Sequence, residues 1–125
     1  MADSVERLYD GVIAARHGDP TTSRTARLLR SGRAKMAKKL AEEAVEVVID
    51  AMNGSRDAVI RESADLIYNL VVLWVSSGVQ PKDVWKEMER RERLFGIAEK
   101  LKAATDVDPR RKVVALDSRR ARKRR

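Results

Sequence analysis

KMAKKLAEEAVEVVIDAMNGSRDAVIRESADLIYNLVVLW, residues 35–74, contains two helical patterns joined by a tight turn. In the first pattern, apolar residues recur from Met36 to Ala51 at the spacing that places them on one face of an α-helix. Asn53 and Gly54 then form a clear stop and turn signal. The second pattern is apolar almost all round over 66–75, which a helix tolerates only when protein surrounds it. The segment therefore predicts an antiparallel helical hairpin at the centre of the fold.

The flanking sequence predicts three more helices and no strands. A first helix should end at the loop His17-Gly18-Asp19-Pro20, and Pro81 occupies a position that favours the start of a fifth helix, which should fray past Gly96. No alternation of apolar and polar residues is bounded by turn residues as a strand would be. We expect an all-α bundle of about five helices, of which the second, third and fourth span about 23–31, 33–52 and 55–77.

The charge of the chain is concentrated at its C-terminal end. A length of 125 residues suits a single domain, and we predict a helical domain over 1–103 followed by a basic, disordered tail over 104–125. Residues 110–125 hold nine Lys or Arg and one Asp, so they account for the whole net charge of +8. Clustered like charges with few apolar residues do not fold alone. The charge therefore indicates weak contact with nucleic acid through the tail rather than a nucleic-acid-binding domain.

Cysteine usage and the apolar runs restrict the compartment. The chain has no cysteine, which excludes disulfides and thiolate metal sites. Its start, MADSVERLYDG, lacks the basic and then apolar layout of a signal peptide. The longest apolar run, 70–75, is far shorter than the roughly 20 residues that span a bilayer. We expect a cytoplasmic protein without a membrane partner.

Two groups of acidic residues lie on the two helices of the predicted hairpin. Glu42, Glu43 and Glu46 share one stripe of the first helix, while Glu62 and Asp65 are three residues apart on the second. The tight turn can bring the groups face to face, where their repulsion calls for a cation. Oxygen ligands alone favour magnesium, with manganese as the alternative. For the first group taken by itself, a solvated acidic face is an equal alternative.

A carboxylate-bound magnesium usually keeps waters and substrate phosphates among its ligands. The metal prediction therefore implies a phosphorylated substrate. Lys35, Lys38 and Lys39 precede the first acidic group and can meet phosphate oxygens, although an exposed basic face is the alternative. Asn69 lies one helical turn beyond Asp65, among apolar neighbours.

These segments resemble the α-helical pyrophosphohydrolases of the MazG-like superfamily, with their E-E-x-x-E and E-x-x-D signatures. Within it, the resemblance is closest to the phosphoribosyl-ATP pyrophosphatase family, and it extends from about Val5 to Lys102. The corresponding stretches are SRTARLL (23–29), KMAKKLAEEAVEVVIDA (35–51) and ESADLIYN (62–69). All five acidic residues are present. The family's usual Tyr, Gly and His are replaced by Arg24, Ala41 and Asn69.

The resemblance implies magnesium-dependent hydrolysis of phosphoribosyl-ATP to phosphoribosyl-AMP and pyrophosphate, a step of histidine biosynthesis. Glu42 and Glu43 become the catalytic candidates, Glu42 as a proton acceptor or as a support for the ligands. The implied metal ligands are Glu43, Glu46, Glu62 and Asp65. The candidate substrate contacts are Arg24, Lys35, Lys38, Lys39 and Asn69.

Three alternatives stay open. Arg24 and Asn69 depart from the family pattern, which leaves room for a pyrophosphohydrolase of another nucleoside triphosphate. A helical module that binds nucleic acid through the tail, and a purely structural dimerisation module, are the non-catalytic alternatives.

The apolar circumference of the 55–77 helix also predicts a homodimer or a dimer of dimers. The residues expected to make that contact are Leu66, Leu70, Leu73 or Trp74.

Overall fold

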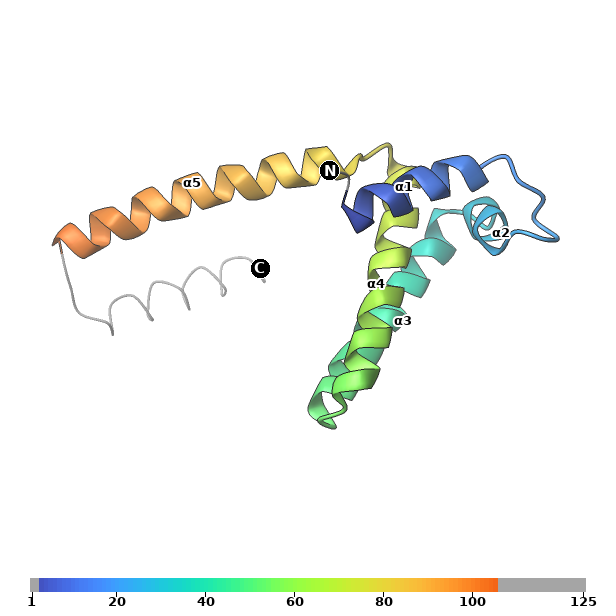
Figure 1. The fold of residues 1–125 in the computed structure, drawn as a ribbon, viewed down its shortest axis with the longest axis horizontal. Coiled ribbons are helices and arrows are strands. Elements are labelled where there is room, and N and C mark those ends of the chain that lie inside the picture. The colour runs from blue at the N-terminus through green and yellow to red at the C-terminus, as the bar shows by residue number, and fades with distance from the viewer. Residues whose placement is uncertain (1–2, 106–125) are drawn as a thin grey trace. The chain divides into compact units, whose positions relative to one another are not determined.

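A computed structural model describes residues 3–105 of the chain, and the side chains of residues 3–96. Over this range the protein consists of five α-helices and no strand (Figure 1). The helices are α1 (Ser4–Ala15), α2 (Arg24–Arg30), α3 (Arg33–Met52), α4 (Arg56–Ser77) and α5 (Pro81–Thr105). The all-α prediction is confirmed, and α3 has the bounds that its periodicity predicted.

The fifth helix extends past Gly96, the point beyond which the sequence predicts that it frays. It runs as one helix to Thr105. One glycine costs a helix about 1 kcal/mol relative to alanine, and the Leu, Lys, Arg and Glu residues around it favour helix. The predicted domain boundary at residue 103 therefore falls inside a helix. The basic run 110–125 lies outside the described residues.

The chain divides into two compact units, Met1–Trp85 and Lys86–Arg125. The first unit contains α1 to α4 and the beginning of α5, while the second contains the rest of α5. Between residues 3 and 105, no helix has both the length and the apolar composition that a membrane span requires. All candidate site residues belong to the first unit.

Local signals explain where the helices of the first unit begin and end. The Asp3 carboxylate accepts a hydrogen bond of 2.7 Å from the backbone N–H of Glu6 and caps α1. Ser23 caps α2 in the same way through the N–H of Ala26, at 3.1 Å. Gly54 has a φ of 74° between α3 and α4, a backbone conformation that glycine adopts without strain. The turn that sets the hairpin therefore depends on this glycine.

The core lies where α1 and α2 cover one part of the α3–α4 hairpin. Helices α3 and α4 pack side by side along their length, and α1 packs against α4 (Figure 1). Leu73 and Trp74 on α4 pack against the core, and Trp74 meets Trp85 edge to face at 6.2 Å. The buried apolar side chains of the core are Val12, Leu28, Met36, Val71, Val72 and Val75.

The remainder of the hairpin leaves apolar side chains uncovered. We term these residues the apolar hairpin face: Val45, Val48, Ile49, Met52, Ile60 and Ile67. Their exposed fractions range from 43% at Ile67 to 83% at Met52. Those on α3 are three or four residues apart, so they form one stripe. This face differs from the residues that the sequence suggested for a dimer contact, each of which is partly buried within the single chain: Leu66, Leu70, Leu73 and Trp74.

Candidate functional site

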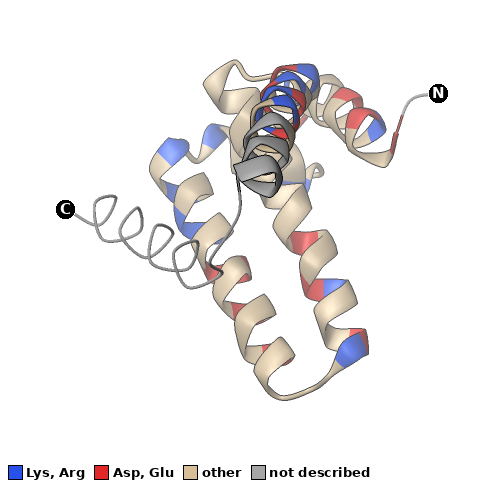
Figure 2. Cartoon of the chain, turned by 90° about the vertical axis from the view of Figure 1, so that its left-hand side faces the viewer, with Lys and Arg blue, Asp and Glu red and all other residues tan. Residues whose placement is uncertain are grey.

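Acidic side chains from α3 and α4 meet across the hairpin. Figure 2 shows Asp and Glu on both helices, with Lys and Arg near the start of α3. Glu43 on α3 and Glu62 and Asp65 on α4 each place one carboxylate oxygen so that the three oxygens lie within 4.8 Å of one another. Glu43 and Glu62 are partly buried and Asp65 is exposed. The predicted face-to-face arrangement of acids therefore exists for these three residues.

Glu46 lies beside this group, and we refer to the four residues Glu43, Glu46, Glu62 and Asp65 as the acidic cluster. The carboxyl groups of Glu46 and Glu62 are close enough to share a proton. Hydrogen bonding of the protonated Glu62 carboxyl group to Glu46, and then to Glu43, raises the pKa of Glu62 to about 7. Burial, together with the charges of Glu46 and Asp65, raises the pKa of Glu43. Without a cation, the cluster therefore holds a proton near neutral pH.

The acidic cluster fits a hard divalent cation. It offers only carboxylate oxygens, which magnesium and manganese prefer, and no His or Cys that would favour zinc. Glu43 Oε2 and Glu62 Oε2 are buried and have no hydrogen-bond partner. Buried acceptors are costly when unpaired, and a cation would satisfy both oxygens. A positive charge there would also oppose the rise in the pKa of Glu62.

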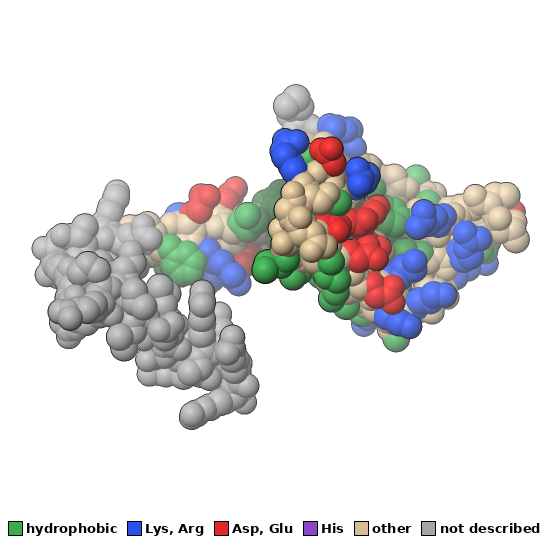
Figure 3. All heavy atoms as spheres, turned by 90° about the horizontal axis from the view of Figure 1, so that it is seen from below, with side chains coloured by type: hydrophobic (Ala, Val, Ile, Leu, Met, Phe, Trp, Pro, Cys, Tyr) green, Lys and Arg blue, Asp and Glu red, His purple; other side chains and the backbone are tan. Residues whose placement is uncertain are grey.

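Glu42 stands apart from this group. It is exposed on α3, and its carboxylate is outside the set of oxygens that lie within 4.8 Å of one another. Figure 3 shows acidic side chains gathered in one patch, with hydrophobic side chains beside it. A role for Glu42 as a proton acceptor therefore stays a prediction.

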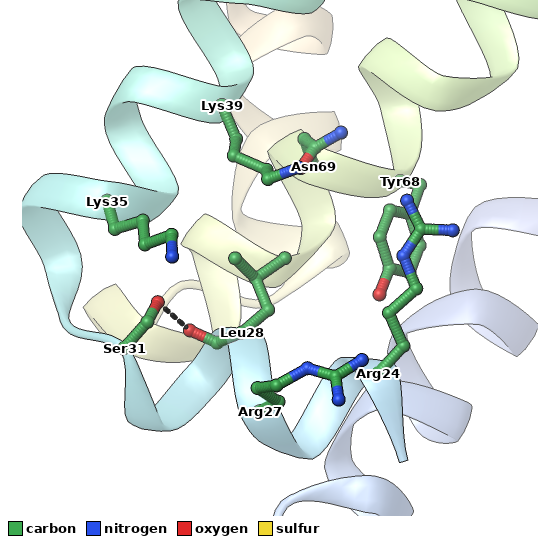
Figure 4. Close-up of a pocket in the computed structure, with 8 residues that line it drawn as sticks. All are labelled: Arg24, Arg27, Leu28, Ser31, Lys35, Lys39, Tyr68 and Asn69. Carbon is green, nitrogen blue, oxygen red and sulfur yellow. Dashed lines mark hydrogen bonds between the residues drawn. The ribbon is translucent and has the colours of Figure 1, made fainter. Parts of the chain in front are cut away.

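The same hairpin also lines a pocket of about 240 Å³ (Figure 4). On α3, Lys39 precedes Glu43 by four residues, and on α4, Asn69 follows Asp65 by four, so each pair is separated by one helical turn. We term this cavity the basic pocket. Its lining comes from α2 and the residue that follows it, from α3 and from α4: Arg24, Arg27, Leu28, Ser31, Lys35, Lys39, Tyr68 and Asn69.

Four of the five predicted substrate contacts line the basic pocket: Arg24, Lys35, Lys39 and Asn69. The fifth, Lys38, is exposed on α3 and is not part of the lining. The pocket contains four cationic side chains and no carboxylate, so its electrostatics suit an anion. The acidic cluster and the basic pocket thus place a cation site and an anion site one turn apart on the same hairpin.

Sequence reasoning missed Arg27, Leu28, Ser31 and Tyr68 as lining residues. Arg27 follows Arg24 by three positions and Ser31 follows Arg27 by four, so the sequence did contain a helical spacing that joins them. Tyr68 carried no such signal, because its apolar neighbours indicated a core position. It is partly buried, and its hydroxyl forms a hydrogen bond of 2.7 Å with Thr25 Oγ1. This bond ties α2 to α4 at the edge of the pocket.

Known proteins resemble this chain over its whole length. Residues 5–92 match the family model described as phosphoribosyl-ATP pyrophosphohydrolase. A protein from Bradyrhizobium diazoefficiens named phosphoribosyl-ATP pyrophosphatase 2 is 63% identical over 133 residues, which cover 99% of this chain and 99% of that protein. One of the same name from Rhodopseudomonas palustris is 63% identical, with complete coverage of both chains. A phosphoribosyl-ATP pyrophosphatase from Gluconobacter oxydans is 54% identical over 77% of this chain and 72% of its own length.

Proposed function

The chain belongs to the phosphoribosyl-ATP pyrophosphohydrolase family, and we propose that its acidic cluster holds the magnesium ion used in that family's reaction. The chain hydrolyses phosphoribosyl-ATP to phosphoribosyl-AMP and pyrophosphate, a step of histidine biosynthesis. The acidic residues of both signature segments contribute to the cluster. Two observations carry the metal proposal: three carboxylate oxygens lie within 4.8 Å of one another, and the buried Glu43 Oε2 and Glu62 Oε2 have no hydrogen-bond partner.

The side chains divide into those that hold the cation and those that neutralise the leaving group. Glu43, Glu62 and Asp65 supply the closest oxygens for the cation, and Glu46 adds a fourth carboxylate at the exposed side. When bound, magnesium neutralises charge on the phosphate under attack and lowers the pKa of a coordinated water. Lys39 lies one turn from Glu43 and offers an ammonium group to the departing pyrophosphate.

The proton of the attacking water needs an acceptor. Glu42 is exposed and lies four residues before Glu46 on α3, so one helical turn separates it from the acidic cluster. We assign the acceptor role to Glu42 on this ground. Glu42→Gln should then lower kcat while leaving magnesium affinity near that of the wild type, and an unchanged kcat would remove Glu42 from the mechanism.

A substrate and metal screen tests the proposed function directly. The full chain is stripped of metal, and pyrophosphate release is then measured with phosphoribosyl-ATP, ATP and the common deoxynucleoside triphosphates. Each substrate is tested with no metal, with magnesium and with manganese. We expect phosphoribosyl-ATP with magnesium to give the highest kcat/KM and metal-free protein to give none. Turnover without any divalent cation would refute the metal role, and preference for another triphosphate would identify a pyrophosphohydrolase of different specificity.

We also infer that the apolar hairpin face is covered by a second copy of the chain. Its six side chains retain roughly half of their surface, so each copy gains of the order of 1 kcal/mol per side chain on burial. Two copies together reach the scale of the association cost of about 4–15 kcal/mol. A two-fold axis pairs the same surface of both copies, so the burial free energy of the stripe on α3 is gained once by each copy.

Sedimentation at micromolar concentration tests this assembly. The wild type should sediment as a dimer or dimer of dimers, and Val48→Lys should shift it toward the monomer. Ile13→Lys is the matched control, because Ile13 is also an exposed apolar residue but lies on α1. A monomeric wild type would contradict the inference.

A further inference from the structure

We propose that the basic pocket binds the phosphoribosyl end of phosphoribosyl-ATP and so separates this substrate from ATP. The inference rests on the proposed function and assigns a ligand to a cavity that the metal chemistry does not require. Phosphoribosyl-ATP carries a triphosphate on one ribose and a second ribose phosphate attached to its adenine base. ATP has the first group and lacks the second.

The charge of the pocket matches a phosphate monoester. Arg24, Arg27, Lys35 and Lys39 converge on about 240 Å³ without a lining carboxylate. In Figure 4 the two lysines project from α3, and the two arginines project from α2. A phosphate monoester carries close to two negative charges at neutral pH and three acceptor oxygens. Guanidinium groups match such oxygens in pairs, so α2 supplies the geometry of a phosphate site.

The position of the pocket separates it from a metal-bound triphosphate. Lys39 is one turn from Glu43, but Lys35 is eight residues away, which corresponds to about 12 Å along α3. Arg24 and Arg27 come from α2, which contributes no residue to the acidic cluster. A triphosphate held at the cluster can meet Lys39 at the near side. The cations farther along the pocket remain for a phosphate at the other end of the substrate.

Asn69 identifies a sugar beside that phosphate. Its side chain is only 6% exposed, and its Nδ2 donates a hydrogen bond of 2.8 Å to the backbone carbonyl of Asp65. This bond fixes the orientation of the amide and leaves Oδ1 as a buried acceptor without a partner. An ionised phosphate has no proton to donate to Oδ1, whereas a ribose hydroxyl does. A ribose phosphate therefore satisfies both the cations farther along the pocket and the orphan carbonyl of Asn69.

The pocket should discriminate against ATP, because ATP leaves polar groups of the protein without a partner. With ATP bound, the distal cations and Asn69 Oδ1 gain no partner, and a site built for a hydroxyl rejects a ligand that lacks it. The same reasoning predicts that ribose 5-phosphate alone occupies the pocket, and that it competes with phosphoribosyl-ATP rather than with the metal.

Two pocket variants and one matched control test the assignment on the full chain with magnesium. Arg27→Gln removes a cation from the pocket, and Asn69→Leu removes the acceptor while keeping the side-chain volume. Arg30→Gln is the control, because Arg30 is an exposed arginine on the same helix that does not line the pocket. The measurements are kcat/KM for phosphoribosyl-ATP, and competitive inhibition by ribose 5-phosphate, inorganic phosphate and inorganic pyrophosphate.

Arg27→Gln should lower kcat/KM about tenfold or more, mainly through KM, because a charge-assisted hydrogen bond is lost. The inhibition constant of ribose 5-phosphate should rise by a similar factor, while that of pyrophosphate stays at the wild-type value. Asn69→Leu should raise the inhibition constant of ribose 5-phosphate and leave that of inorganic phosphate unchanged. Arg30→Gln should match the wild type throughout.

The assignment is overturned if ribose 5-phosphate does not inhibit the wild type. It is also overturned if Arg27→Gln raises the inhibition constant of pyrophosphate as much as that of ribose 5-phosphate. The pocket would then hold the triphosphate. Failure of the proposed function looks different, since the wild type would not hydrolyse phosphoribosyl-ATP at all. In that case calorimetric binding of ribose 5-phosphate to the wild type and to Arg27→Gln still decides the assignment of the pocket.

Discussion

Magnesium affinity should fall about tenfold between pH 8 and pH 6. The shared hydrogen bonds in the acidic cluster raise the pKa of Glu62 to about 7 when no metal is present. A cation needs its carboxylate ligands deprotonated, so below this pKa each bound ion must displace a proton. At pH 6, roughly nine molecules in ten carry that proton, which weakens the apparent affinity about tenfold. At pH 8 the proton is already gone and the penalty disappears.

The same proton affects the stability of the metal-free protein. The folded-state pKa of Glu62 lies above its ordinary value of 4.5, so the folded chain binds this proton more tightly than the unfolded chain. The resulting stabilisation is complete below about pH 4.5 and is lost as the pH rises to about 7. Magnesium should therefore raise the melting temperature more at pH 8 than at pH 6, because it binds more tightly where the cluster is fully charged.

Calorimetric titration with magnesium at pH 6 and pH 8 tests these expectations. Titrations in two buffers of different ionisation enthalpy should show the release of about one proton at pH 6 and almost none at pH 8. Glu62→Gln should bind magnesium more weakly and with little difference between the two pH values. Glu89→Gln, which changes an exposed carboxylate of α5, serves as the control and should follow the wild type. The reasoning is refuted if wild-type affinity is equal at both pH values, or if Glu62→Gln keeps the full pH dependence.

Three further outcomes are expected. Asp65→Asn should abolish pyrophosphate release without changing the circular dichroism spectrum. Asp57→Asn, in the first turn of α4, is the control and should keep activity. An active Asp65→Asn would contradict the metal site. Tyr68→Phe should lower the free energy of unfolding by about 1 kcal/mol and the melting temperature by about 4–8 °C, because it removes the 2.7 Å bond to Thr25. Adding Thr25→Val should cost little more, and fully additive losses would show that the two residues are not coupled. Removing 110–125 should leave hydrolysis unchanged and eliminate salt-sensitive binding of DNA or RNA, and a parallel loss of activity would assign the tail to substrate binding.

The hairpin and its carboxylates could be predicted from the sequence because both depend on local spacing. Periodicity gave the bounds of α3, and intervals of three and four residues placed Glu43 and Glu46 on one stripe, opposite Glu62 and Asp65. These relations follow from the geometry of a single helix and one tight turn. They hold wherever the hairpin forms.

The pocket and the uncovered surface could not be predicted in this way, because they depend on packing between helices. Arg27 and Asn69 meet only when α2 and α4 come together, and nothing local to either helix signals that contact. Periodicity likewise grouped Met36 with Val48 on one apolar face. Met36 is buried and Val48 is 61% exposed, since the cover that α2 provides is near the start of α3.

The one-turn offset between the pocket and the cluster places substrate selection and metal binding on separate residues of the same two helices. Arg27 and Asn69 can be exchanged for other side chains while Glu43 and Asp65 keep their places, so a new substrate can be accepted without rebuilding the reaction centre. A single residue inserted between the paired positions would instead rotate one set about 100° away from the other. An insertion between Lys39 and Glu43, or between Asp65 and Asn69, should therefore separate the lining of the pocket from the acidic cluster.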